Sequence, residues 1–471
     1  MPIPPPSSQS PSLPPEAWPP LHRLVHRAKR PLERFLHIEA ASGIILLLCA
    51  VVALLWANAP GTNSYAALWQ TPLGLRVGSL VLERSLAWVV NDVLMVLFFF
   101  VVGMEIRREL QYGELSEWRR ALLPVAAALG GMLIPALLYL ALAGAPSVRQ
   151  GWGVPMATDI AFAVGVLTLL GPRVPPALRV LLLALAVIDD LGAILVIAIF
   201  YSSGIALSGL GIALLGLALI VLLQRLGIRS KLIYVVPGVV TWLGIYSAGI
   251  HPTIAGVCIG LLTPVRAWLG PQAFFRDLRE RAEVLLVQDS QVEPQPDVAA
   301  QLRALDRARR EARSPAEELI ERLHPWVAFV IMPLFALANA GVSLRGLAWI
   351  DGSQQVVMGI GAGLVLGKLI GVLLACALLL HLRLASLPRG LSLRHLIVLG
   401  GVAGIGFTMS LFTAQLAFPA GALLEAAKLG VLAASACAGV ASLICGRLIL
   451  PAAVDAGQAK TADEAEASTE Q

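Results

Sequence analysis

Residues 176–200 read PALRVLLLALAVIDDLGAILVIAIF, an apolar run long enough to decide the fold class. About 20 mostly apolar residues suffice for a helix to cross the hydrocarbon core of a membrane. Asp189 and Asp190 lie near the centre of the run. A charged side chain at that depth costs about 2.5–3.5 kcal/mol on insertion scales and seldom lacks a function. The stretch therefore predicts a membrane-spanning helix and supplies the first candidate site residues.

The composition of the whole chain agrees with a membrane protein. Of 471 residues, 57% are hydrophobic and 14% charged, whereas a soluble domain averages about 25% charged residues. This hydrophobicity excludes a soluble globular protein and a disordered chain. The five cysteines are odd in number and lie in apolar runs, which indicates packing residues and not disulfides or a metal site. The net charge of +5 resides mostly in loops beside apolar runs, so nucleic-acid binding is not indicated.

Twelve apolar runs qualify as spanning helices, which predicts an all-α polytopic membrane protein. With the N-terminus placed inside, 17 Lys and Arg fall in the short inner segments and four in the outer loops. This asymmetry predicts that both termini are cytoplasmic. The predicted spans are residues 40–58, 87–104, 121–143, 151–170, 176–200, 205–224, 232–247, 252–264, 326–342, 356–380, 395–417 and 426–450.

Three segments outside the predicted spans have distinctive compositions. Residues 1–35 form a Pro-rich, basic tail and residues 451–471 an acidic tail, both predicted to be cytoplasmic. The cytoplasmic loop 265–325 is long, and residues 301–323 within it alternate Arg and acids with Leu and Ala. That pattern is typical of a solvated helix stabilised by charge pairs. A role at a lipid surface or a partner protein is the alternative interpretation.

The first outer loop contains a candidate β-hairpin. Residues 75–82, LRVGSLVL, alternate around Gly78-Ser79, which predicts two short strands and a periplasmic turn. A hairpin outside the bilayer has an exposed edge that can pair with a second copy of the chain.

Four ionisable residues fall near the centres of their spans: Asp159, Asp189, Asp190 and Lys368. Neighbouring helical residues point about 100° apart, so one of the paired acids can meet the lysine while the other faces a cavity. Removal from water and a nearby acid both favour the protonated form of that second carboxylate. Its oxygens also suit a hard cation. Competition between the two predicts a cation/proton antiporter that acid inhibits. The alternative is an ion pair that only fixes helix packing.

Two spans carry signals of a broken helix. Residues 151–159 read GWGVPMATD, where Pro155 removes a backbone donor. Residues 400–408 read GGVAGIGFT. These stretches lie in the fourth and the eleventh predicted span, each the middle member of a three-span unit (spans 3–5 and spans 10–12). The pattern therefore predicts inverted repeats whose unwound helices cross at an ion site. Asp159 can offset the partial positive charge of the half-helix N-termini, and Lys368 the negative charge of the C-termini. Ordinary glycine packing is the alternative.

Several motifs together resemble the bacterial NhaA-type sodium/proton antiporters, in order over residues 36–450 except the long loop. They are ATDIAF at 157–162, AVIDDLG at 186–192, LHPWV at 323–327, FALANAG at 335–341, Gly367-Lys368 and GIGFTMS at 404–410. The resemblance implies that Asp190 is the main Na⁺, Li⁺ and proton site. Asp189 would be its partner, paired with Lys368, a further candidate proton carrier. Thr158 and Asp159 would belong to the first broken helix, and Gly404 and Gly406 to the second.

The resemblance also implies residues for the response to pH. Glu105, Arg108 and Glu109 match the mouth of a cytoplasmic funnel, and Asp92 matches an acid near the outer end of the same span. His251 matches a histidine that affects the pH response; a satisfied histidine at a helix end is an equal alternative. The sequence departs from the family where Ile320 replaces an acidic residue, with Glu321 one step displaced. The hairpin at 73–84 matches a dimer contact.

These observations predict a twelve-helix inner-membrane antiporter, not an enzyme, that exports Na⁺ or Li⁺ for H⁺ without a cofactor. Two protons per cation would make exchange electrogenic. The expected partners are the ions, membrane lipid and a second copy of the chain. An intramembrane aspartic protease is disfavoured because Asp189 and Asp190 are consecutive on one helix. A Na⁺-coupled symporter for an organic anion would need further polar residues, of which spans four and eleven offer few.

Overall fold

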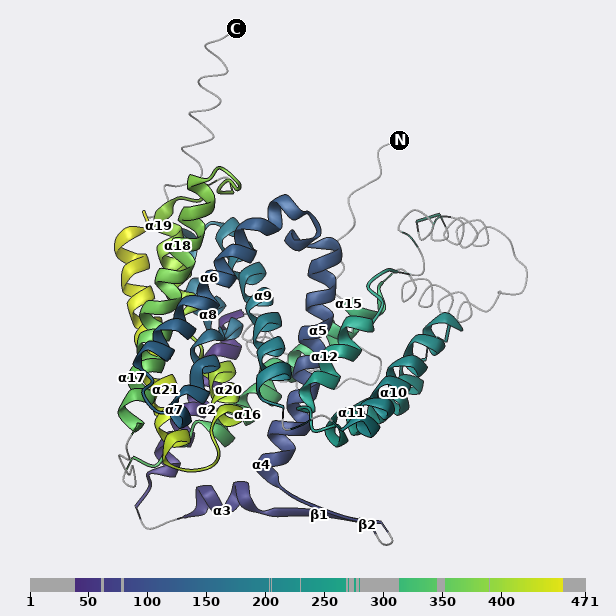
Figure 1. Cartoon of the computed structure of the whole chain (residues 1–471). Helices are drawn as coiled ribbons and strands as arrows, with labels where there is room; N and C mark the ends of the chain where they lie inside the picture. The colour runs from purple at the N-terminus through teal and green to yellow at the C-terminus, as the bar shows by residue number, and fades with distance from the viewer. Residues whose placement is uncertain are drawn as a thin grey trace, which may run out of the picture.

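The computed structural model describes residues 39–451 except 61–62, 78–79, 203, 205, 229, 268–269, 271–274, 277–278, 280–312, 345–351 and 389. Helices dominate this part of the chain (Figure 1). The first half contains α2 (Glu39–Ala57), α3 (Ser64–Gln70), β1 (Pro72–Val77), β2 (Leu80–Ser85), α4 (Leu86–Trp88), η1 (Val89–Leu94), α5 (Met95–Tyr112), α6 (Trp118–Leu142), α7 (Pro146–Arg149), η3 (Gln150–Met156), α8 (Ile160–Leu170), α9 (Pro176–Phe200), α10 (Leu207–Arg225), α11 (Val235–Ser247) and α12 (Thr253–Leu262). The second half contains α15 (Pro315–Trp326), η6 (Val327–Ile331), α16 (Met332–Asn339), α17 (Ser353–Ala362), η7 (Gly363–Gly367), α18 (Lys368–His381), α19 (Leu393–Ala403), α20 (Phe407–Ala417) and α21 (Ala422–Ile449).

The helices are long and apolar enough for an integral membrane protein. Among the described residues, seven helices can cross a membrane, and two bent pairs raise the number to nine if each pair is one span. Three shorter apolar helices are Ala41–Ala57, Lys231–Ser247 and Thr253–Leu262. Large apolar side chains point away from the bundle: Leu48, Leu137 and Leu215 are 58%, 60% and 65% exposed. Such an apolar exterior is typical of a surface that lipid covers.

The helices pack in two groups (Figure 1). In one group α6 packs against α9 and α18, and α17 against α21. In the other, α5 packs against α12, and α10 against α11. Helix α8, like α20, contacts α21 of the first group, and α16 continues α15, which contacts α5 of the second. Helix α2 packs against both α8 and α16, so it touches both groups.

The helix at the ninth predicted span begins earlier in the sequence than predicted. The sequence predicts its start at 326, but the helix begins with α15 at Pro315, inside the predicted loop 265–325. Ser314 forms a capping box: its hydroxyl accepts from the backbone N–H of Glu317, 3.1 Å away, and the Glu317 side chain accepts from the Ser314 N–H. Pro315 suits the first helical position. The charged face of this helix lowers its hydropathy, so the apolar run alone could not show its start.

Three spans contain a wide, π-helical turn that the sequence did not predict. These turns are η1 before α5, η6 before α16 and η7 before α18. Such turns insert an extra residue into the helical hydrogen-bond ladder and often mark functional positions. Turn η1 contains Asn91 and Asp92, and η7 ends immediately before Lys368.

Strands β1 and β2 form an antiparallel pair at the base of the helices, beside α3 (Figure 1). Their register runs from Pro72 opposite Ser85 to Val77 opposite Leu80. Arg84 donates a hydrogen bond to the Tyr246 hydroxyl of α11 over 2.5 Å. Its guanidinium also lies 5.7 Å from the ring centroid of Trp88. The base of the hairpin is therefore fixed to the helices.

The loop after α2 is bonded to a segment far away in the chain. Asn58 donates to the carbonyl of Val342 over 2.7 Å and accepts from the N–H of Leu344 over 2.7 Å. Tyr65 in α3 lies near the carbonyls of Leu337 and Ala338, at 2.9 and 2.8 Å. These contacts fix the end of α16.

Candidate functional site

Two of the spans are broken, and their breaks touch. The first bends by 47° between Pro146–Met156 and Ile160–Arg173, and the second by 46° between Leu393–Ala403 and Phe407–Ala417. These are the spans whose Gly and Pro patterns predict a break. The backbone N–H of Asp159 donates to the carbonyl of Ile405 over 2.7 Å, so an extended segment of one span bonds directly to the other.

Glycines allow this close crossing. A Cβ atom at Gly404 would lie 2.3 Å from the carbonyl oxygen of Leu364 in η7. A Cβ atom at Gly406 would lie 2.2 Å from the Ser410 hydroxyl and 2.9 Å from the carbonyl oxygen of Ala157. Both distances are below van der Waals contact, so a side chain at either position would push the broken span away from its neighbours.

Gly404→Ala is therefore expected to destabilise the protein by about 1–3 kcal/mol, the usual cost of overpacking. Thermal unfolding of the purified protein in detergent measures the loss. Gly165→Ala is the matched control, because Gly165 lies in α8 and nothing approaches its Cβ position within 4 Å. That change is expected to be neutral or to stabilise by up to about 1 kcal/mol. Equal effects of the two substitutions would contradict the steric explanation.

Asp159 lies at the N-termini of two half-helices. Its side chain accepts from the N–H of Phe162 in α8 and from the N–H of Thr408 in α20, each over 3.1 Å. The Thr408 hydroxyl also donates to this carboxylate. Helix N-termini carry partial positive charge and unpaired N–H groups. One carboxylate therefore caps both half-helices, and Thr408 is a partner that the sequence analysis did not single out.

A buried ion pair joins the span of α9 to the span of α18. Lys368 and Asp189 are both 0% exposed, and the lysine ammonium contacts a carboxylate oxygen of Asp189. The ammonium also donates to the Thr158 hydroxyl over 3.0 Å. That hydroxyl lies 2.6 Å from Asp189 and 2.9 Å from the carbonyl of Ala403, the last residue of α19. The Thr158 hydroxyl therefore lies between the lysine ammonium and the C-terminus of the half-helix α19.

Asp190 takes no part in this pair, as the 100° offset between neighbours predicts. It is 2% exposed, and its Oδ1 has no hydrogen-bond partner among the described residues. The carboxylates of Asp189, Glu105 and Asp159 and the ammonium of Lys368 all lie within electrostatic range. A buried carboxylate without a donor is costly, and a bound proton or cation would remove that cost.

The residues predicted to respond to pH do not form one group. Glu105 lies within electrostatic range of Asp190 and of Arg108, which in turn acts on His324. The Glu109 side chain instead accepts from the N–H of Glu114 over 2.7 Å and caps the turn after α5.

The other two predicted pH residues, His251 and Glu321, pair with groups outside the ion pair. His251 lies at the opposite end of the α5 span, where its Nε2 is 3.6 Å from Asp92 and its Nδ1 is 2.9 Å from the Thr253 hydroxyl. Glu321 is 65% exposed and pairs with Arg313, while Ile320 is buried. The displaced acid therefore faces outward and the apolar residue takes the inward position.

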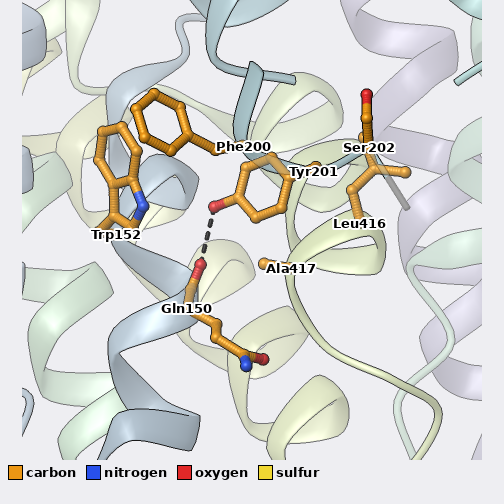
Figure 2. A pocket seen from close by; sticks show the side chains of 7 residues that line it. All are labelled: Gln150, Trp152, Phe200, Tyr201, Ser202, Leu416 and Ala417. Carbon is orange, nitrogen blue, oxygen red and sulfur yellow. Dashed lines mark hydrogen bonds between the residues drawn. The ribbon is translucent and has the colours of Figure 1, made fainter. Parts of the chain in front are cut away.

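A cavity of about 340 Å³ lies where η3 begins and where α9 and α20 end (Figure 2). The Tyr201 hydroxyl donates to the Gln150 carbonyl over 2.8 Å at its wall, beside Trp152 and Phe200. None of the residues that the sequence predicts for the site lines this cavity. The predicted site is instead the closely packed crossing of the broken spans.

An apolar helix bundle that buries three carboxylates and an ammonium at the crossing of two broken spans defines a membrane ion transporter. Residues 33–445 match the family described as Na+/H+ antiporter 1, and the chain belongs to this family. A protein named Na(+)/H(+) antiporter NhaA 2 from Myxococcus xanthus is 62% identical over 97% of each chain. A protein of the same name from Sorangium cellulosum is 55% identical over 98% of each chain.

The solved sodium proton antiporter MjNhaP1 from Methanocaldococcus jannaschii aligns with 92% of this chain and 96% of its own, at 12% identity and a TM-score of 0.48. Membership of the family establishes Na⁺/H⁺ exchange as the function, as the sequence predicts. Both ions are transported substrates, and the relatives are named as transporters. The organic-anion symporter finds no support among these relatives.

Proposed function

We propose that Asp190 is the group that binds Na⁺ and H⁺ in turn. The observation that carries this proposal is that its buried Oδ1 has no donor and its carboxylate no cation partner among the described residues, whereas Asp189, whose Oδ1 also lacks a donor, pairs with Lys368 through its other oxygen. A carboxylate in this position must attract either a proton or a small hard cation, and it cannot hold both. The same oxygens suit Li⁺. Protons displace the cation at low pH, so exchange slows as the medium becomes more acidic.

Asp189 and Lys368 support this site as a pair. When Asp189 is bonded to the ammonium, Asp190 is the carboxylate free to bind an ion. If Na⁺ draws Asp189 away, Lys368 loses its partner in a buried environment. Thr158 connects the pair to both broken spans, and Asp159 keeps their N-termini together. Each ion therefore changes the charge at the crossing of the helices.

Access alternates between the two sides of the membrane. A site with two ionised acids and no bound ion is strongly charged, which opposes movement through an apolar surround. Binding of Na⁺, or of protons, reduces that charge and permits the switch. A ligand shifts such an equilibrium only by its difference in affinity for the two states. Exchange follows because the site without a bound ion does not switch its access from one side of the membrane to the other.

Two protons for each Na⁺ would move one net charge per cycle. A charge crossing the membrane gains about 2.3 kcal/mol per 100 mV. In vesicles without a pH gradient, a potassium diffusion potential of about 100 mV, negative inside, is therefore expected to expel Na⁺ to an outside/inside ratio of about 50. Tracer Na⁺ measures the ratio, and clamping the potential to zero is the control. A ratio that stays at one would show electroneutral exchange.

The arrangement in the membrane is part of the proposal. We infer twelve crossings, formed by the long helices, the two bent pairs and the three shorter apolar helices together. Both termini would lie in the cytoplasm of a bacterium, with residues 1–35 and 451–471 as tails and the segment 265–314 as a cytoplasmic loop. The excess of Lys and Arg in the inner segments supports this orientation in the inner membrane.

In the same orientation, the hairpin at 73–84 would lie on the periplasmic side of the membrane. Its strands pair only with each other in the described part of the chain, and an exposed strand edge suits pairing with a second copy. We therefore propose a homodimer through this hairpin.

The proximity of Glu105 to Asp190, and of Arg108 to Glu105, supports a role for these two residues in the response to pH. For Glu109 and His251, the contacts described above support positions at helix ends, and Glu321 faces outward.

A further inference from the structure

Helix α20 is bonded to the other helix group by a cluster of side-chain amides. The Asn339 amide, 4% exposed at the end of α16, donates to Asn91 in η1 over 2.8 Å. It also donates to the carbonyl of Phe335 over 2.9 Å, within its own helix. Its carbonyl oxygen accepts from the Gln415 amide of α20. Asn339, Asn91 and Gln415, the amide cluster, therefore join three spans.

A layer of aromatic rings lies one helical turn away from the amides. The Phe412 ring of α20 has its centroid 5.4 Å from that of Phe99 in α5 and 6.2 Å from that of Phe335 in α16. The His251 ring lies edge-on to Phe412 at 5.3 Å. These contacts are apolar and can slide, whereas the amides are directional. The amide cluster is thus the specific bond between α20 and α16.

The position of Asn339 is itself fixed from outside the bundle. Tyr65 reaches the carbonyls of Leu337 and Ala338, and its oxygen accepts from the N–H of Gly341 over 3.1 Å. A Cβ atom at Gly341 would lie 2.2 Å from the Tyr65 ring, so glycine is needed there. Burial raises the pKa of the Tyr65 phenol above its usual value, and the hydroxyl stays a donor. The acceptor for Gln415 is therefore held in place.

We propose that the amide cluster positions α20 and keeps the ion site closed towards the hairpin end of the molecule. One end of α20 bonds to Asp159 at the crossing, and the other end bonds to Asn339. Access to Asp190 from the hairpin end requires α20 to separate from α16. Separation breaks the Gln415–Asn339 bond and takes this partner from the partly buried Gln415 amide, while Asn339 keeps its bonds to Asn91 and to the Phe335 carbonyl. The cluster therefore favours the state that is closed at that end. This inference rests on the proposed site and orientation.

Gln415→Leu keeps the approximate size of the side chain and removes the donor. Loss of one hydrogen bond of typical net strength shifts a two-state equilibrium by about 2- to 10-fold. The KM for Na⁺ at the hairpin face is therefore expected to fall by about 2- to 10-fold, while the KM at the opposite face does not fall. Right-side-out and inverted vesicles expose the two faces separately, and Na⁺-dependent proton flux gives both constants.

Thr413→Val is the matched control on the same half-helix. Thr413 is 2% exposed, and among the described residues its hydroxyl bonds only to the carbonyl of Met409 within α20. Its replacement is expected to leave the ratio of the two KM values unchanged. Wild-type KM values at both faces of Gln415→Leu, with or without a lower maximal rate, would overturn the proposal. A fall in the KM for Na⁺ that is seen only in inverted vesicles would support the role of the amide cluster and would show that the proposed membrane orientation is reversed.

A cross-link tests the same proposal if Gln415→Leu does not fold. In the double variant Asn339→Cys/Gln415→Cys, a short bifunctional thiol reagent is expected to reduce exchange at least tenfold, and a cleavable reagent allows its recovery. The two single variants, treated identically, control for the native cysteines. Full cross-linking with unchanged exchange would overturn the proposal. Asp190→Asn, in contrast, abolishes exchange without a cross-link, so the two failures are distinguishable.

Discussion

Asp190→Asn is expected to reduce Na⁺/H⁺ exchange at least about 100-fold, equivalent to ~2.7 kcal/mol or more. Asparagine has nearly the same shape, but its amide neither takes up a proton at physiological pH nor supplies the charge that holds Na⁺. Na⁺-dependent dissipation of a pH gradient in inverted vesicles, measured from pH 6 to 9, gives the rate. Robust exchange by this variant would remove Asp190 from the mechanism.

The stability of the same variant separates a transport defect from a folding defect. Because the Asp190 Oδ1 has no donor in the structure, replacing the carboxylate by a neutral amide breaks no described hydrogen bond at that atom. The thermal stability of Asp190→Asn is therefore expected to equal or exceed that of the wild type. A large loss of stability would show that Asp190 has a structural partner and would contradict the proposed free carboxylate.

Lys368→Met is expected to destabilise the protein by about 3–5 kcal/mol, because it leaves Asp189 buried without its counter-ion. Both side chains are fully buried and the ammonium contacts the carboxylate directly. Unfolding of the purified protein in detergent measures the loss. Lys428→Met is a suitable control, since Lys428 pairs with Glu425 on the same helix across 3.3 Å, and Glu425 retains 33% of its side-chain exposure.

The double variant Asp189→Asn/Lys368→Met decides whether the loss comes from the ion pair. Removal of both charges leaves neither member of the pair buried without its counter-ion, so most of the lost stability is expected to return. A double variant as unstable as Lys368→Met would show that lost packing, and not charge, is responsible. Exchange by the double variant has a separate meaning. Retained electrogenic exchange would leave Lys368 a structural role only.

Much of the fold could be predicted from the sequence because the membrane simplifies the problem. Apolar runs of about 20 residues mark spans irrespective of tertiary contacts, and the Gly and Pro patterns at 151–159 and 400–408 fall where the structure bends. The sequence could not place the start of α15, whose charged residues and capping box lower its hydropathy. It also could not predict the π-helical turns, because these depend on packing between helices.

The charged residues of the site could be predicted from the sequence, but their hydrogen-bond partners in distant segments could not. The offset between Asp189 and Asp190 correctly predicts that one acid meets Lys368 and the other does not. The link from Thr158 to Ala403 depends on how two distant segments cross, and no local pattern encodes that. The amide cluster was missed for the same reason. Asn and Gln in spans carry no charge, so they do not stand out as Asp and Lys do.

The contacts of Asn58 have a consequence for the order of biosynthesis. This residue lies 284 positions before Val342, to whose carbonyl it donates. A ribosome adds about 5–20 residues per second, so the partner emerges on the order of tens of seconds after the first span has been inserted. Until then, Asn58 has only local partners such as the Leu54 carbonyl, 2.8 Å away, and water. Helix α2 therefore cannot take up its final position until this distant segment has been synthesised. The helix bundle is completed only late in translation.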